Sequence, residues 1–217
     1  MLSGSSLRRC YEVAPARVRQ ALEAEIEFVL QHIPNSARVL ELGCGFGRVL
    51  APLLGRAREV VGIDTSLGSL RMAREILGGS ESCQLCAMDA ALLGLSDEAF
   101  DVVVCIQNGL SAFKVDQTHV VREGVRVTRR GGIALFSSYS EKFWAQRLEW
   151  FRIQSDHGLI GEIDWDRTGD GVIVCRDGFR ATTLEPRDFR RLARASGCSA
   201  QLVEVDASTL FCILSVN

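Results

Sequence analysis

The stretch that most constrains the fold is VLELGCGFGRVL, residues 39 to 50, in which an apolar run ending in a carboxylate leads into three glycines at alternate positions. The apolar run has the length of a short buried strand. Glycine adopts positive φ angles without a steric penalty, so the glycines predict a tight loop that lets a ligand approach the backbone closely. A dinucleotide, a phosphate or another small molecule could occupy such a loop.

Strand-like and helix-like segments alternate around this loop. Buried strands are predicted at ARVLEL, REVVGID, SCQLCAMDA, FDVVVCIQN and GGIALFSSYS. Helices are predicted at PARVRQALEAEIEFVLQHI, GRVLAPLLGRA, SLGSLRMAREIL and THVVREGVRVT, and a turn at RRGG. Strands that are apolar on both faces and alternate with helices indicate a parallel sheet covered on both sides. The predicted fold class is therefore α/β, with a doubly wound sheet.

The pattern changes after Tyr139. EKFWAQRLEWFR predicts a helix, and residues 158–183 contain short alternating runs separated by Asp and Gly turns, as in a small antiparallel insertion. A last helix at EPRDFRRLARASG precedes two adjacent strands, AQLVEVDA and STLFCILSVN, which we expect to pair as a closing hairpin. We expect residues 1–217 to form one domain, with an insertion at 140–183 after the fifth strand.

Composition excludes several classes of protein. The net charge of −2 argues against nucleic acid as the main partner, because phosphate binding needs a surplus of Lys and Arg. No apolar stretch reaches the length of about 18 residues that spans a bilayer, and MLSGSSLRRCYE lacks a secretory apolar core, so we expect a cytoplasmic protein without a membrane partner. Nothing in the sequence indicates an oligomeric state.

The eight cysteines lie mostly within apolar runs, where they behave as small reduced core residues. Cys83 and Cys86 form a CxxC, but on a strand residues three apart point to opposite faces and cannot share a metal. We therefore predict no metal site.

The ligand of the glycine loop follows from two residues. Counted from Gly43, the third glycine of a GxGxxG dinucleotide loop would be residue 48, which is Arg48. Glu41, two residues ahead of Gly43, would repel a phosphate and suits a cation. S-adenosylmethionine carries a cationic sulfonium and an ammonium group, and it fits these residues better than a dinucleotide.

ELGCGFG resembles the first motif of the class I S-adenosylmethionine-dependent methyltransferases, and the resemblance extends over about residues 37–139. VVGIDTS, CAMDA, AFDVVVCIQN and RRGGIALFS resemble the family's following motifs in order. The resemblance implies a Rossmann-like, seven-stranded, mostly parallel sheet whose last strand is antiparallel and lies between its neighbours. The predicted closing hairpin agrees with that topology.

The resemblance also implies residue roles. Asp64 would hold both ribose hydroxyls, Asp89 would lie near the adenine amino group, and Met88 and Ala90 would lie beside the ring. Tyr11 resembles the amino-terminal tyrosine that folds over the cofactor in many small-molecule members, which makes residues 1–34 a helical lid. The predicted cofactor-binding residues are Tyr11, Glu41, Gly43, Cys44, Gly45, Gly47, Asp64, Thr65, Met88, Asp89, Ala90, Cys105, Ile106 and Gln107.

Acceptor-side residues should follow the carboxyl ends of the strands. We name Asn108 to orient the substrate, Tyr139 to donate to or shield the acceptor, and His157 as a base within the insertion. Packing and local backbone contacts are the structural alternatives for the first two. Trp144, Leu148 and Phe151 share one helical face, which either packs on the core or forms a wall of the acceptor site.

The predicted function is methyl transfer from S-adenosylmethionine to a small-molecule acceptor by in-line displacement, with S-adenosylhomocysteine as product. Proximity and orientation would supply most of the catalysis. A non-catalytic S-adenosylmethionine-binding partner or sensor protein is the first alternative, and a protein methyltransferase is the second. Gln107, Asn108, Gly109 and Leu110 replace the Asn or Asp followed by Pro-Pro and an aromatic of the nucleic-acid amino-methylating members.

Overall fold

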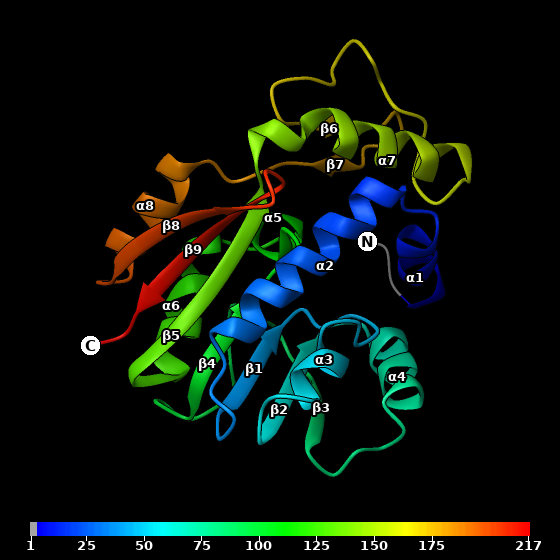
Figure 1. Cartoon of the computed structure of the whole chain (residues 1–217). Coiled ribbons are helices and arrows are strands. Elements are labelled where there is room, and N and C mark those ends of the chain that lie inside the picture. Colours follow the sequence, from blue (N-terminus) through cyan, green and yellow to red (C-terminus); the bar gives the residue numbers. More distant parts are fainter. Residues whose placement is uncertain (1–3) are drawn as a thin grey trace.

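The computed structural model describes residues 4–217 and is built on a seven-stranded sheet with strand order β3-β2-β1-β4-β5-β9-β8 (Figure 1). The strands are β1 Arg38–Leu42, β2 Glu59–Asp64, β3 Cys83–Ala87, β4 Phe100–Cys105, β5 Thr128–Tyr139, β8 Ser199–Val205 and β9 Thr209–Ser215. The first five are parallel, and β9 runs antiparallel to both β5 and β8. The predicted fold class and the closing hairpin are confirmed.

Helices cover both faces of this sheet, and in Figure 1 α2 crosses in front of the strands while α6 lies behind them. One face packs against α2 Ala16–Gln31, α3 Leu50–Leu54 and α4 Leu67–Ile76, and the other packs against α5 Gly109–Ala112, α6 Gln117–Val127 and α8 Pro186–Ala195. Side chains alternate between the two faces along a strand. In β4, Val102 and Val104 belong to the core on the α2 face, whereas Val103 and Cys105 belong to the core on the α6 face.

A third core joins the amino-terminal helices to the predicted insertion. Its elements are α1 Gly4–Glu12, the 3₁₀ turn η1 Glu141–Phe143, α7 Trp144–Asp156, β6 Ile173–Val174 and β7 Arg180–Ala181. Val18 and Leu22 of α2 pack with Trp150 and Phe151 of α7, and the Trp150 indole donates a hydrogen bond to the Cys10 carbonyl at 2.9 Å. Residues far apart in the sequence therefore form one layer above the carboxyl ends of the strands.

Four local predictions differ from the structure. Tyr11 lies within α1 instead of before the first helix, and the helix predicted at 47–57 is shortened to α3 because Gly47 still has a positive φ of 85°. The expected RRGG turn is instead an irregular start of β5, with Gly131 at φ 74°. In the insertion, the run GLIGEIDW at residues 158–165 forms no strand and contributes only the isolated bridge between Ile163 and Cys175.

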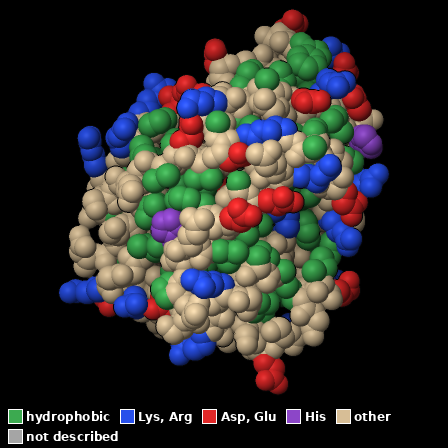
Figure 2. Space-filling model, viewed as in Figure 1, with side chains coloured by type: hydrophobic (Ala, Val, Ile, Leu, Met, Phe, Trp, Pro, Cys, Tyr) green, Lys and Arg blue, Asp and Glu red, His purple; other side chains and the backbone are tan. Residues whose placement is uncertain are grey.

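Charged side chains of both signs are interspersed over the face shown in Figure 2. Among residues 4–217, no helix is long and apolar enough to cross a membrane, and no group of three or more His, Cys, Asp or Glu side chains could hold a metal ion. All eight cysteines are free thiols.

The close approach of the glycine loop to β2 gives a test of this packing. A Cβ added to Gly62 would lie 2.7 Å from a Leu50 methyl and 3.0 Å from the Cys44 sulfur. Gly62→Ala should therefore lower the free energy of unfolding by about 1–3 kcal/mol in urea denaturation, since overpacking displaces its neighbours. Gly169→Ala is the matched control, because an added Cβ there has no neighbour within 4 Å. Equal stability of the two variants would contradict the packing described.

Candidate functional site

The glycine loop after β1 has the backbone geometry that its sequence predicts. Gly43, Gly45 and Gly47 have φ angles of 76°, 54° and 85°, a region that other residues rarely adopt. The amides of Gly43 and Cys44 both donate to the Ile63 carbonyl at 2.8 Å. The loop is thus fastened to the end of β2 and exposes its backbone at the carboxyl edge of the sheet.

Asp64 ends β2 and ties two backbone segments together. One carboxylate oxygen accepts the Gly45 amide at 2.9 Å, and the other accepts the Ser66 amide at 2.7 Å. Each carboxylate oxygen can accept more than one hydrogen bond, so Asp64 keeps capacity for further donors. The side chain is partly exposed to the cavity beside it.

A cavity of about 160 Å³ opens beside Asp64 at the carboxyl ends of the strands. It is lined by Gly43, Asp64, Thr65, Met88, Asp89, Ala90, Phe113, Lys114 and Val115. Six of these residues are among those predicted to bind a cofactor, and the fold brings them together from three separate loops. One oxygen of Asp89 accepts the Ala91 amide at 2.8 Å, which fixes the turn after β3.

The other three lining residues, Phe113, Lys114 and Val115, were not predicted from the sequence. They follow α5, and the Phe113 ring is close enough to Gly43 that an added Cβ would lie 2.7 Å from it. The sequence signal that could have identified Phe113 is an aromatic residue in the loop after the fourth strand. It lies several residues beyond Asn108, the last residue of that loop that was named as a candidate.

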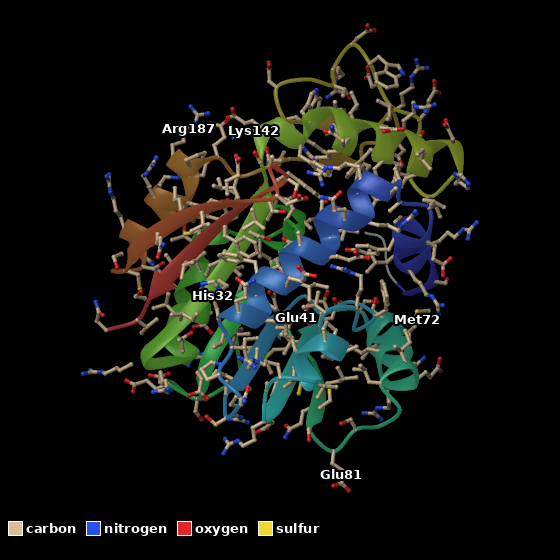
Figure 3. All side chains as sticks on the ribbon, viewed as in Figure 1. His32, Glu41, Met72, Glu81, Lys142 and Arg187 are labelled. Carbon is tan, nitrogen blue, oxygen red and sulfur yellow. The ribbon has the colours of Figure 1, made fainter. Side chains whose placement is uncertain are left out.

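Two side chains of opposite charge next to the glycine loop, Glu41 and Arg48, have buried polar atoms without a hydrogen-bond partner among residues 4–217. Glu41 near the end of β1 is 4% exposed, and it is labelled in Figure 3. Its Oε2 and the Nε and Nη2 of Arg48 have no hydrogen-bond partner among residues 4–217. The Arg48 guanidinium lies 5.0 Å from the centre of the Tyr11 ring. A buried polar atom without a partner is costly, so this arrangement favours a ligand with groups of both charges.

Burial raises the pKa of Glu41 to about 8, the neighbouring Arg48 charge opposes this increase, and Asp64 adds to it. With a pKa of about 8, the carboxyl group is mostly protonated at neutral pH when no ligand is bound. A cationic group at this position would lower the pKa again.

A hydrogen-bond chain connects α1 to the end of β4. The Tyr11 hydroxyl donates to the side-chain oxygen Oε1 of Gln107 at 2.7 Å, and the backbone amide of Gln107 donates to Glu25 Oε1 at 2.9 Å. Ser137 of β5 also donates to Glu25 Oε1. Gln107 Nε2 has no partner among the described residues. Gln107 therefore presents a donor beside the predicted lid residue Tyr11.

Glu25 was missed by the sequence interpretation. It is 3% exposed, and burial raises its pKa. Ala21, Glu25 and Val29 lie at i, i+4 and i+8 on the buried face of α2. A single carboxylate at a core position of an amphipathic helix is the signal that could have identified it.

The three predicted catalytic residues have different surroundings. Asn108 is buried with φ 60°, donates to the Thr182 carbonyl at 2.8 Å and accepts from Ser138 at 2.8 Å, so both ends of its amide are engaged. Tyr139 ends β5, and burial raises its pKa. His157 is exposed at the end of α7, where Nδ1 contacts the Ile153 carbonyl at 2.8 Å, and it does not line the cavity beside Asp64.

Three other predicted cofactor residues have buried side chains. Cys44 and Ile106 belong to the core on the α2 face, and Cys105 belongs to the core on the α6 face. Because these side chains are buried, only the backbone groups of the three residues could contact a bound cofactor. Burial also raises the pKa of the Cys44 and Cys105 thiols, which disfavours a thiolate role.

The fold and the site together define a Rossmann-like protein with a cofactor site at the carboxyl ends of a parallel sheet. A family model described as a methyltransferase domain matches residues 39–132. Over these residues the chain is therefore similar to the S-adenosylmethionine-dependent methyltransferases of class I, a family whose cofactor is S-adenosylmethionine.

Several methyltransferases are similar in sequence. A 2-methyl-6-phytyl-1,4-hydroquinone methyltransferase of Synechocystis is 27% identical over 139 residues, 59% of this chain and 42% of that protein. A phosphatidylethanolamine N-methyltransferase of Cereibacter sphaeroides is 40% identical over 101 residues, 45% of this chain and 48% of that protein. A tRNA N(3)-methylcytidine methyltransferase of Drosophila melanogaster is 29% identical over 146 residues, 63% and 43% of the two chains. The chain matches less than half the length of these relatives.

The fold is also similar to that of solved structures. The PH0226 protein of Pyrococcus horikoshii superposes with a TM-score of 0.68 at 20% identity, over 94% of this chain and 92% of that one. At this identity the likeness establishes the fold alone.

The residues present fit S-adenosylmethionine. The zwitterionic methionine part requires one anionic and one cationic partner, and Glu41 and Arg48 beside the glycines each have buried polar atoms without a hydrogen-bond partner in the described part of the chain. The adenosine part requires a cavity with a carboxylate for the ribose, and Asp64 lines that cavity.

The raised pKa of Glu41 predicts a pH dependence of stability. The pKa of Glu41 is near 8 in the folded protein, above the value of 4.5 for an unperturbed Glu. The contribution of this group to the free energy of unfolding is therefore complete below about pH 4.5 and is lost as the pH rises toward 8. Without cofactor, Glu41→Gln should gain roughly 2–5 kcal/mol relative to wild type between these limits. The measurement is urea unfolding of both proteins at several pH values. Parallel stability curves would contradict the buried, unpaired state of Glu41.

Proposed function

We propose that the chain transfers the methyl group of S-adenosylmethionine to a small-molecule acceptor and releases S-adenosylhomocysteine. The observation that carries this proposal is the set of buried polar atoms of Glu41 and Arg48 that have no hydrogen-bond partner among residues 4–217, next to the glycine loop whose Gly43 lines the cavity beside Asp64. A phosphate-bearing dinucleotide would place negative charge next to Glu41, so the pair favours the cationic cofactor.

Each part of the cofactor has candidate residues. Glu41 would accept from the ammonium group, Arg48 would donate to the carboxylate, and Asp64 would accept from the ribose hydroxyls. The adenine would lie beside Met88, Asp89 and Ala90, against Phe113 and Val115. When bound, S-adenosylmethionine supplies a methyl group on a cationic sulfur, which the acceptor lone pair attacks in line.

The chain's own contribution to the reaction is positioning. Tyr11 bonds to Gln107 and so holds α1 across the end of β4, which supports the role of residues 1–34 as a lid. Asn108 connects Ser138 of β5 to Thr182 of the insertion, so it would fix the acceptor side relative to the strands. Reactants that are held close together in a closed site react faster, because they are already positioned and water is excluded.

A second cavity, of about 440 Å³, supports residues 140–183 as the acceptor side. We call it the insertion cavity, and Tyr139, Trp144 and Arg147 are among its lining residues. Its volume falls within the range of small-molecule sites, about 300–1,000 Å³. Because Tyr139 ends β5, the cavity adjoins the carboxyl edge of the sheet. Its size favours a small acceptor over a protein segment or a folded nucleic acid.

His157 remains a prediction as a base, without support from its exposed position. Glu25 contacts both Gln107 and Ser137 at the ends of β4 and β5, but like His157 it lines neither cavity, so neither residue is assigned as a base. A general base is needed only when the acceptor is protonated at the working pH.

The cofactor assignment predicts selective binding. In isothermal titration, S-adenosylmethionine and S-adenosylhomocysteine should bind, and NADH should not. Asp64→Ala should weaken S-adenosylmethionine binding by more than about tenfold, since loss of a charged hydrogen-bond partner costs about 1.5–3 kcal/mol. Asp166→Ala, an exposed change in the insertion, is the control. Binding of NADH without S-adenosylmethionine, or an unchanged affinity in Asp64→Ala, would refute the assignment.

A non-catalytic binding protein would pass that titration, so turnover needs its own test. The protein should convert S-adenosylmethionine carrying a CD₃ group into S-adenosylhomocysteine in the presence of a metabolite extract, with a 17 Da gain in one small molecule on mass spectrometry, roughly the replacement of H by CD₃. Label found only in protein would favour the protein-methyltransferase alternative. Binding without any labelled product would favour the sensor alternative.

A further inference from the structure

The insertion cavity contains a buried cation without a counter-ion. Arg147 of α7 is 1% exposed and lines the cavity. Its Nη1 donates to the Gly171 carbonyl at 2.8 Å, its Nη2 lies 3.4 Å from the Thr182 carbonyl, and its Nε has no partner among residues 4–217. No carboxylate in the described part of the chain forms an ion pair with it. A guanidinium in this state exerts a strong field, because little water screens it.

Aromatic rings surround this guanidinium. It lies 4.9 Å from the centre of the Tyr139 ring, 5.4 Å from that of Phe151 and 5.8 Å from that of Trp144. The rings compensate part of the charge but offer no hydrogen-bond acceptor comparable to a carboxylate. The floor of the cavity therefore favours an anionic group flanked by apolar surface.

Carboxylates line the same cavity in more exposed positions. Asp170 and Glu141 are exposed, and neither forms an ion pair with any residue in 4–217. Glu185 is already engaged, because it pairs with Arg187 at 2.9 Å and caps α8. Two carboxylates with free acceptor capacity thus lie at the mouth, where a cationic group would be favourable.

The two charges share one wall but do not pair. Arg147 donates to the carbonyl of Gly171, the residue directly after Asp170, yet the Asp170 carboxylate forms no ion pair with the guanidinium. An acceptor that was only a cation would leave Arg147 uncompensated. One that was only an anion would meet the carboxylates at the mouth. A molecule with both charges satisfies both groups.

We propose that the insertion cavity binds a small zwitterion of the amino-acid class, with its carboxylate toward Arg147 and its ammonium group toward Asp170 and Glu141. The Tyr139 and Trp144 rings form the apolar walls for the rest of the molecule. This inference rests on the proposed function, because it names the class of the methyl acceptor.

The test is isothermal titration of the full chain, saturated with S-adenosylhomocysteine, with each of the twenty standard amino acids. At least one should bind. For the tightest binder, the amine lacking the carboxylate and the acid lacking the amino group should each bind at least about tenfold more weakly. If no amino acid binds, or if either single-charge counterpart binds as tightly, the inference is wrong.

Variants separate the two charges. Asp170→Asn should weaken binding of the amino acid by about tenfold or more and leave binding of the acid counterpart unchanged. Arg147→Gln should weaken binding of the amino acid to a similar extent and leave binding of the amine counterpart unchanged. Because Arg147 is buried, Asp170→Asn decides the question if Arg147→Gln does not fold. Asp156→Asn, an exposed change on α7 outside the cavity, should bind as wild type does.

The saturation step distinguishes this inference from the proposed function. Binding of S-adenosylhomocysteine with no amino-acid binding overturns only the acceptor class. Failure of S-adenosylhomocysteine to bind overturns the proposed function as well. An Asp170→Asn variant with wild-type affinity for the amino acid would remove the ammonium site.

Discussion

The site depends on the way in which Asp64 fastens the glycine loop to the end of β2. Its carboxylate accepts the Gly45 and Ser66 amides, while the Ile63 carbonyl accepts the amides of Gly43 and Cys44. These bonds hold three positive φ angles in place, which only glycine adopts readily. The loop backbone at Gly43 therefore borders the cavity without a side chain, and Asp64 serves both the fold and the cavity.

Unpaired buried charge is the second organising feature. Glu41 and Arg48 at the glycine loop, and Arg147 in the insertion cavity, each have at least one buried polar atom without a hydrogen-bond partner among residues 4–217, and none of the three forms an ion pair there. Such groups lower the stability of the empty protein and strengthen binding of a complementary ligand, because their desolvation has already occurred. Two of these groups contact the layer of α1, α2 and α7 directly, because Arg48 lies against the Tyr11 ring of α1 and Arg147 belongs to α7.

The strand order and the glycine loop could be predicted because they follow from local patterns: apolar runs, helical periodicity and glycines at fixed spacing. The predicted cofactor residues Asp64, Met88 and Asp89 meet at one cavity because parallel strands all end at the same edge. Glu25 and Phe113 stand out only by their residue type at their positions, and Arg147 does not stand out, so the sequence assigned a role to none of the three. Their roles depend on contacts between segments that are far apart in the sequence, and nothing in their immediate neighbours specifies those contacts.

The most direct test of the central claim is proton release when S-adenosylmethionine binds. The pKa of Glu41 is about 8 without a ligand, and a cation beside it should lower that value, so binding at pH 7 should release a proton. Calorimetric titration in two buffers with different ionisation enthalpies measures this. We predict a buffer-dependent heat in the wild-type protein that disappears in Glu41→Gln. Equal heats in both buffers, or the same buffer dependence in the variant, would contradict the account.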